Sequence, residues 1–339
     1  MRCDCIDKNS FILVIGGAGF LGSAVVHELN NQGIYNIDVA DELDDDEKWR
    51  NLRPLRFRSF GSRGQLEDRL KHEEALKYDC VFHFGGTCEP ASKDMAALMN
   101  DYRFTVGLVN KCIQSGTMVL YASDYAVYGE SSIPFSDDGR NLRSFSPLSA
   151  YAYSRYLADT TIFGDGEANL NGIVICMRIS DVFGPNEYHK DKTNGKSMIS
   201  LMLEEHGNVS VPFWIDENGI RRQFIRDFVY VKDAAKMSVW LACSVRKSGI
   251  YNIGSGNSLS FDEIVQKTCD ASDGLVEFGN VGWVDWSKCG DARRYGILDM
   301  QKIKSAGCPW PQYSFDDAIR EYCWYWRHRC RLGEEGLLF

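Results

Sequence analysis

The segment VIGGAGFLGS constrains the fold more strongly than any other part of the sequence. It places Gly16, Gly19 and Gly22 at intervals of three, between the apolar run FILVIGG and a helical stretch. Glycines at this spacing permit a tight turn, a close backbone approach to a pyrophosphate and close packing of helix on strand. The helix N-terminus adds backbone amides and a partial positive charge. The segment therefore predicts a dinucleotide site that includes Phe20 and Leu21; the alternative is a turn that serves packing alone.

Short apolar runs alternate with amphipathic stretches through residue 180. This alternation is typical of repeated strand-helix units, and hence of a parallel sheet with right-handed crossovers. We expect a long helix over residues 95–115 and strands at FILVIGG, YNIDVAD, LRFRSF, CVFHFGG, MVLYAS and NGIVICMRIS. The pattern predicts an α/β Rossmann fold with a doubly wound parallel sheet.

The pattern loosens after residue 183, where loop-like segments separate shorter expected elements. We expect a helix ending near residue 205, helices over 234–244, 261–269 and 315–331, and strands at VSVPF, QFIRDFVYV, GIYNIGSG and LVEFG. These pieces predict a smaller, interleaved C-terminal substrate domain. The expected division is a dinucleotide-binding domain of residues 1–182 plus 224–256, and a substrate domain of residues 183–223 and 257–339.

Composition excludes several classes of function. The chain has 339 residues and a formal net charge of -9, which attracts neither nucleic acid nor an anionic membrane. No apolar run approaches the roughly 18 residues that a membrane span requires, and the first ten residues lack the apolar core of an export signal. The twelve cysteines are scattered and the six histidines do not cluster with them. We therefore expect a cytoplasmic protein with reduced thiols and no metal site.

An acidic segment, VADELDDDEKW, ends the second expected strand. A carboxylate about 20 residues beyond such glycines typically binds the adenosine ribose hydroxyls. Asp41 is the candidate, with Glu42 beside it. The negative charge opposes a 2'-phosphate and slightly favours NAD over NADP, although Lys48 is able to offset that charge. For residues 44–47 we expect a solvated loop and no role in binding.

Several motifs resemble the extended short-chain dehydrogenase/reductase family, which comprises sugar-nucleotide epimerases and dehydratases. They occur in the family's order over nearly the whole chain: GGAGFLG, VFHFGG, LYASDYAVYGE, YAYSR, DVFGP, RDFVYVKD and YNIGSGN. Within the family, NQGIYNIDVADEL, VFGPNEYHK and GKSMIS look most like the ADP-glyceromanno-heptose 6-epimerases. The resemblance implies tightly bound NAD or NADP, a nucleotide-diphosphate sugar between the domains, and a homo-oligomer.

The resemblance also implies a reaction, in which a sugar carbinol is transiently oxidised and the hydride returns to the opposite face of the ketone. Two alternatives stay open. One is an oxidoreductase that releases a keto-sugar, and the other is a catalytically silent dinucleotide-binding sensor. Dehydratase chemistry is disfavoured, because Tyr125 and Ala126 stand where dehydratases of the family usually carry an acidic pair.

Tyr151 and Arg155 match the family's tyrosine acid/base and its lysine, and their spacing of four puts them on one helix face. A phenol has an unperturbed pKa of about 10, so cationic neighbours must supply about three units, roughly 4 kcal/mol, for work as a phenolate at neutral pH. Arginine keeps the positive charge and can bond the ribose. It does not lose a proton near neutrality, so a proton relay through Arg155 is closed.

Asp124 occupies the position at which the family has serine or threonine. An ionised carboxylate there opposes a tyrosinate and raises the pKa of Tyr151. Together the two replacements suggest a compensated pair, in which Asp124 and Arg155 bond each other across the cofactor pocket. In the alternative, Asp124 faces solvent and Arg155 is a surface cation.

Further site residues follow from the matched motifs. Lys190 matches a second base of the heptose epimerases, and its alternatives are phosphate binding or a mobile surface lysine. The expected cofactor contacts are completed by Phe84, Gly85, Gly86, Asp101, Ala122, Ser123 and Val182. The expected substrate contacts are Thr87, Asp124, Asp181, Lys190, Ser197, Arg226, Arg293 and Arg294, with Arg222 as another phosphate candidate.

Overall fold

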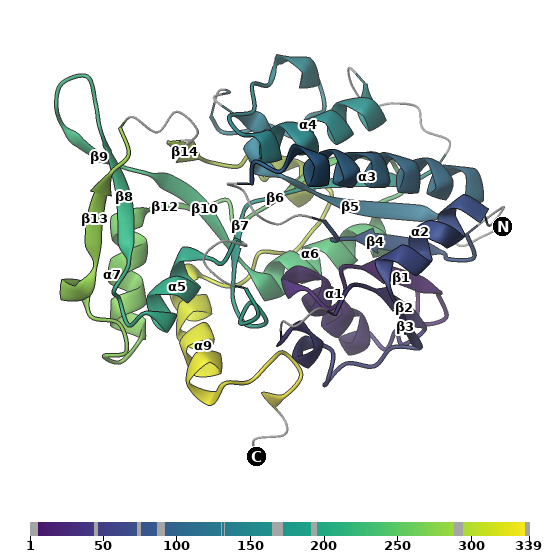
Figure 1. Ribbon diagram of the computed structural model, residues 1–339, viewed down its shortest axis with the longest axis horizontal. Coiled ribbons are helices and arrows are strands. Elements are labelled where there is room, and N and C mark those ends of the chain that lie inside the picture. The colour runs from purple at the N-terminus through teal and green to yellow at the C-terminus, as the bar shows by residue number, and fades with distance from the viewer. Residues whose placement is uncertain are drawn as a thin grey trace.

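The computed structural model describes residues 6–43, 47–72, 76–86, 92–129, 131, 133–164, 172–190, 195–287 and 294–335. A seven-stranded parallel sheet forms the largest layer, and two smaller sheets lie to one side of it (Figure 1). The strand order of the large sheet is β11-β6-β5-β4-β1-β2-β3. The order reverses next to β1, which confirms the doubly wound Rossmann fold expected from the sequence.

The seven strands of this sheet are β1 (Ile12–Ile15), β2 (Ile37–Ala40), β3 (Ser59–Gly61), β4 (Cys80–His83), β5 (Met118–Asp124), β6 (Val174–Ile179) and β11 (Gly249–Ile253). The helices against it are α1 (Phe20–Asn31), α2 (Arg63–His72), α3 (Met95–Ser115), α4 (Ala150–Phe163) and α6 (Val231–Ser244). In Figure 1, α1 and α6 cover one face of the sheet, and α3 and α4 cover the other. Ile12 and Val14 belong to one core cluster and Leu13 and Ile15 to the other, because side chains alternate along a strand.

The smaller sheets come from the second half of the chain. One contains β7 (Asp181–Phe183), β10 (Ile225–Tyr230), β12 (Ser258–Ser260) and β14 (Tyr295–Gly296), and the other β8 (Ser210–Ile215), β9 (Arg221–Gln223) and β13 (Gly282–Asp285). They are accompanied by α5 (Met198–Glu204), α7 (Phe261–Ala271) and α9 (Phe315–His328), whereas α8 (Gln301–Ser305) contacts β11 of the large sheet. β10 lies outside the large sheet although β11 joins it, and the expected domain division stays a prediction.

Two local expectations differ from the structure. The strand expected at LVEFG is wrong. The Ser272 hydroxyl accepts a hydrogen bond from the backbone nitrogen of Val276 in a turn, and a short 3-10 helix follows (Phe278–Asn280). The next strand along the chain is β13. The strand expected at LRFRSF shrinks to β3, since Leu55 is bonded into a turn onto Leu52. α2 gave no sequence signal, because among its residues only Leu66 is buried and no apolar stripe exists. Within the described ranges, no helix has the length and apolar character to cross a bilayer.

Candidate active site

A cavity of about 590 Å³ opens at the carboxyl ends of the strands of the large sheet, where α/β folds bind ligands. It extends to β7, β10 and the start of α7, so both halves of the chain contribute. Most of the residues expected from the sequence line it: Gly16, Gly19, Phe20, Leu21, Gly22, Asp41, Lys48, Phe84, Gly85, Gly86, Ala122, Ser123, Asp124, Tyr151, Asp181, Val182, Lys190 and Ser197.

Other expected residues lie elsewhere. Among the described residues, the lining does not include Glu42, Asp101, Arg155, Arg222, Arg226 or Arg294. Arg222 pairs with Asp216, and the Arg294 guanidinium stacks on Trp214. Thr87 and Arg293 lie outside the described residues. Sequence reasoning missed Ile179, Ser180, His189, Gly195, Lys196, Met198, Phe228 and Phe261, although Lys196 and Met198 fall within the recognised stretch GKSMIS.

The glycine turn fits a pyrophosphate. Gly16 has a φ of +75°, and a Cβ there would lie 2.7 Å from the backbone nitrogen of Gly85. A Cβ on Gly22 would lie 2.0 Å from the carbonyl oxygen of Gly16. α1 begins after Gly19 without a capping side chain and without an acidic residue in its first turn. The helix N-terminus is therefore shaped for an anion that backbone amides bind.

Replacing Gly22 with alanine tests this packing. We expect the added methyl group to push α1 off the turn at a cost of about 1–3 kcal/mol in the free energy of unfolding, with loss of NAD binding. Gly107 is the matched control, since a Cβ there meets nothing within 4 Å. Gly107→Ala is expected to keep NAD affinity and gain about 0.5–1 kcal/mol. Chemical denaturation and calorimetric NAD titration measure both; unchanged NAD affinity in Gly22→Ala would contradict the assignment.

Asp41 joins the glycine turn to the end of β2. Its Oδ2 accepts hydrogen bonds from the backbone nitrogens of Ala18, at 2.8 Å, and Gly19, at 3.2 Å. Its Oδ1 lies 3.3 Å from Nζ of Lys48, which itself lines the cavity. The carboxylate thus stands at the edge of the turn, beside a cation that offsets part of its charge.

Lys190 lies near the first residue of α1. Its Nζ is 4.6 Å from the centroid of the Phe20 ring and donates a hydrogen bond to the carbonyl oxygen of Gly195 at 3.3 Å. Burial, followed by the charges of Lys190 and Lys48, lowers the pKa of His189 to about 3. His189 is therefore neutral at physiological pH, and this end of the cavity is cationic through its lysines.

Tyr151 and Asp124 face each other across the opposite end. Ser149 caps α4 by accepting a hydrogen bond from the backbone nitrogen of Ala152, which fixes Tyr151 in the first turn. The Tyr151 side chain is buried, and its hydroxyl donates to Oδ2 of Asp124 at 3.2 Å. Oδ1 of Asp124 accepts from the backbone nitrogen of Ala126 at 2.6 Å. The carboxylate is thereby directed at the phenol.

Arg155 lies behind Tyr151. Its guanidinium carbon is 5.3 Å from the centroid of the Tyr151 ring, and its Nη2 is 4.0 Å from Oδ2 of Asp101. Asp101 is buried and also accepts a hydrogen bond from Arg63 at 3.1 Å. The structure thus pairs Arg155 with Asp101, and the expected pair with Asp124 stays a prediction.

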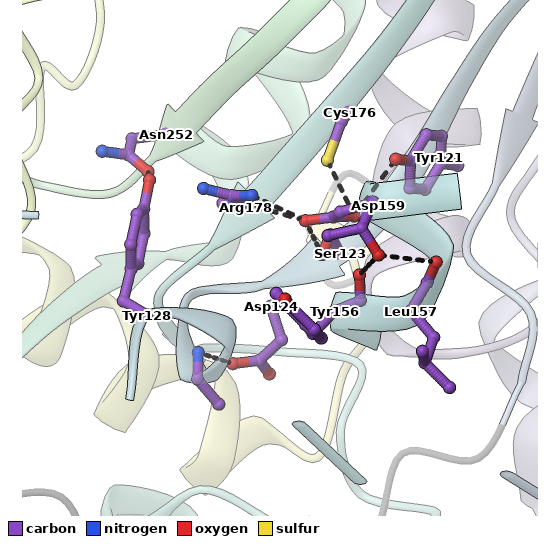
Figure 2. A network of polar contacts seen from close by, with 12 residues as sticks. Tyr121, Ser123, Asp124, Tyr128, Tyr156, Leu157, Asp159, Cys176, Arg178 and Asn252 are labelled. Atoms are coloured by element: carbon purple, nitrogen blue, oxygen red, sulfur yellow. Dashed lines mark hydrogen bonds and ion pairs between the residues drawn. The ribbon is translucent and has the colours of Figure 1, made fainter. Parts of the chain in front are cut away.

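A buried ion pair, Arg178 with Asp159, lies next to Ser123 at the end of β5 (Figure 2). Oδ2 of Asp159, on α4, accepts hydrogen bonds from Nε of Arg178 on β6, at 3.0 Å, and from the Ser123 hydroxyl, at 3.1 Å. Oδ1 accepts from the Tyr121 hydroxyl at 3.1 Å and from the Cys176 thiol at 3.3 Å. Burial first and then Asp159 raise the pKa values of Tyr121 and Cys176, which stay protonated donors.

Asp181 faces the cavity from β7. Its Oδ2 accepts a hydrogen bond from the Tyr125 hydroxyl at 2.6 Å and lies 3.9 Å from Nε of Arg226. Arg226 therefore reaches the site through Asp181, although it is not part of the lining. No group of three or more His, Cys, Asp or Glu residues within the described ranges is arranged to hold a metal ion.

Comparison with known proteins agrees with this geometry. Residues 12–254 match the NAD dependent epimerase/dehydratase family. The chain belongs to this family. It is 31% identical over 324 residues to the ADP-L-glycero-D-manno-heptose-6-epimerase of Nitratidesulfovibrio vulgaris strain DP4, covering 91% of this chain and 96% of that relative. An enzyme of the same name from Brachyspira hyodysenteriae is 29% identical over 318 residues, covering 92% and 96%.

Solved structures of the family share the fold. The ADP-L-glycero-D-manno-heptose-6-epimerase of Helicobacter pylori has a TM-score of 0.75 at 22% identity, covering 96% of this chain and 98% of that one. The UDP-glucose 4-epimerase of Thermus thermophilus, solved with NAD, has a TM-score of 0.71 at 21% identity, covering 94% and 99%. The resemblance inferred from the motifs is confirmed, and membership of this NAD-dependent family supports NAD(P) binding.

Proposed function

We propose that this chain is an NAD(P)-dependent nucleotide-sugar epimerase that acts by transient oxidation of a sugar carbinol, with an ADP-heptose as the first substrate to test. One observation carries the proposal: the hydroxyl of Tyr151 and the glycine turn line the same cavity. The similarity to the heptose 6-epimerases over 91% of the chain supports the substrate class.

The residues divide between binding and proton transfer. The glycine turn and α1 hold the pyrophosphate, Asp41 the adenosine ribose, and Arg155 and Asp101 support the nicotinamide end from behind Tyr151. NAD(P) bound there would supply the hydride acceptor for the oxidation and the hydride donor for the return. Tyr151 takes the carbinol proton at its phenolic oxygen and gives it back to the ketone oxygen.

Lys190 has two roles to distinguish. Its contact with Phe20, at the start of α1, supports the phosphate alternative, because α1 directs its N-terminus at the pyrophosphate. The role of second base toward the sugar stays a prediction. A homo-oligomer, a cytoplasmic location and tight retention of the cofactor are predictions as well.

The deciding experiment incubates the purified protein and NAD with ADP-heptose and a panel of UDP-, GDP- and dTDP-sugars in deuterated water. Product stereochemistry is followed by NMR, and reduced nicotinamide by absorbance. An inverted sugar supports the epimerase. Accumulated ketone with reduced cofactor indicates an oxidoreductase that releases its keto-sugar. Cofactor binding without turnover of any sugar indicates a silent sensor.

We also propose a preference for NAD over NADP, set by Asp41. Asp41→Asn is expected to lower NAD affinity by about tenfold or more, because hydrogen bonds to charged groups contribute about 1.5–3 kcal/mol. The affinity for NADP should fall less than the affinity for NAD, since the change also removes charge repulsion against the 2'-phosphate. Calorimetric titration with both cofactors gives the ratio. Glu42→Gln is the control, because Glu42 does not line the cavity. If Glu42→Gln changed the ratio of NAD to NADP affinity more than Asp41→Asn does, the assignment of this preference to Asp41 would be wrong.

A further inference from the structure

Asp124 is placed to do more than replace a hydroxyl. One carboxylate oxygen accepts a hydrogen bond from the backbone nitrogen of Ala126, and the other accepts a hydrogen bond from the Tyr151 hydroxyl at 3.2 Å. Both side chains line the cavity. The resting arrangement is therefore a neutral phenol that donates to an ionised carboxylate.

The surroundings of Tyr151 do not favour a phenolate. A carboxylate beside the phenolic oxygen repels a second negative charge. The cation behind the ring, Arg155, has its own counter-ion in Asp101, which is buried. Part of the positive charge that would make the phenol acidic is thus already balanced. Arg155 also does not pass a proton onward at neutral pH.

We propose that Asp124 is the terminal proton acceptor of a two-residue relay and that Tyr151 works as a neutral phenol. In the oxidation step, the O–H bond of the carbinol breaks and an O–H bond forms at the Tyr151 oxygen. At the same time the original Tyr151 O–H bond breaks and an O–H bond forms at Oδ2 of Asp124. The electron pair leaves the carbinol carbon as the hydride of the proposed function, on which this inference rests. The return step reverses both proton transfers, so no proton or electron is gained overall.

The charged and titratable groups around Asp124 come from several elements. Tyr125 and Tyr128 follow it directly in the chain, and α4 contributes Tyr151, Arg155 and Asp159. β6 contributes Arg178, opposite Ser123 in the register, and β7 contributes Asp181. Lys190 and Lys196 lie in the same cavity, and Nζ of Lys196 is 2.7 Å from Glu204. These are the groups whose charges act on the Asp124 carboxylate.

The first test needs no sugar. Protein saturated with NAD and labelled with ¹³C at tyrosine Cζ is titrated by NMR, and Tyr151→Phe assigns the signal of Tyr151. The relay predicts that Tyr151 stays protonated past neutrality and titrates at or above the ordinary phenol range of about 10. In Asp124→Asn the midpoint should fall. A wild-type midpoint near pH 7, or one that Asp124→Asn leaves unchanged, would overturn the relay.

The second test follows turnover of ADP-heptose, or of whichever sugar of the panel reacts, against pH. Asparagine keeps an oxygen that accepts from the nitrogen of Ala126 but does not store a proton. The relay predicts that Asp124→Asn lowers kcat at pH 7 by about 10²–10⁴-fold and moves the remaining activity to higher pH. If Asp124 only repels a catalytic tyrosinate, the activity instead moves to lower pH and kcat at pH 7 rises.

Asp138→Asn is the matched control, because Asp138 is exposed and pairs with Arg140 away from the cavity. Its kcat and pH profile should equal those of the wild type. Unfolding curves and NAD titration confirm that each variant is folded and loaded. If no sugar reacts, the proposed function fails while the NMR titration still decides whether Asp124 and Tyr151 share a proton as inferred.

Discussion

Tyr151→Phe is expected to lower kcat for the nucleotide-sugar by about 10²–10⁴-fold, the usual contribution of a positioned acid/base. The change removes only the hydroxyl that donates to Asp124. The ring stays buried in front of the Arg155 guanidinium, so NAD affinity should change by less than about threefold, which is about 0.7 kcal/mol. A large loss of kcat with nearly unchanged NAD affinity would show that the Tyr151 hydroxyl takes part in the reaction and does not merely pack against the cofactor site.

Tyr153→Phe provides the control. Tyr153 lies on the same helix, two residues later, and its side chain is 45% exposed. Turnover of this variant should match the wild type. Epimerisation assayed by NMR and NAD binding measured by calorimetry report both quantities. Full activity in Tyr151→Phe would remove Tyr151 from the reaction.

Arg178→Met is expected to lower the free energy of unfolding by about 3–5 kcal/mol, because it leaves the Asp159 carboxylate buried without its counter-ion. Arg178 is 1% exposed and Asp159 is fully buried. The guanidinium carbon also lies 4.7 Å from the ring centroid of Tyr128 and 5.1 Å from that of Phe145. The Arg178–Asp159 pair joins α4, which carries Tyr151, to β6, the neighbour of the strand that ends at Asp124.

The double variant Asp159→Leu with Arg178→Met separates charge from packing. Removing both charges leaves no buried ion unpaired, so its loss of stability should be smaller than that of Arg178→Met alone. Urea unfolding followed by circular dichroism gives the three free energies. Equal losses of unfolding free energy in the single and double variants would show that packing, and not the ion pair, stabilises the contact between α4 and β6.

The same pair shows where reasoning from the sequence stops. Arg178 lies in NGIVICMRIS and was assigned only to a strand, because a lone arginine in an apolar run has no visible partner. Its partner is 19 positions earlier, on a helix. The two meet because β5 and β6 pair in parallel with Ser123 opposite Arg178, a register that the local sequence does not reveal.

Asp101 is a second case. The sequence predicted Asp101 only as a cofactor contact and paired Arg155 with Asp124, since both of these replacements fall on recognised catalytic positions. In the folded chain α3 packs against α4, and this contact puts Asp101 beside Arg155. Arg63 also donates a hydrogen bond to Asp101, and it belongs to α2, which the sequence did not predict.

The sequence by itself determined the doubly wound sheet, the glycine turn, Asp41 and the Tyr151 position, because each depends on short-range periodicity or on spacing within one strand-helix unit. Tertiary structure decided which side chains meet: Asp124 with Tyr151, Arg155 with Asp101, and Lys190 with Phe20 at the start of α1. Such pairs depend on packing angles and strand register between distant segments. A shift of a few ångströms between such segments changes which carboxylate lies within hydrogen-bond distance of a given side chain, and the local sequence does not predict that shift.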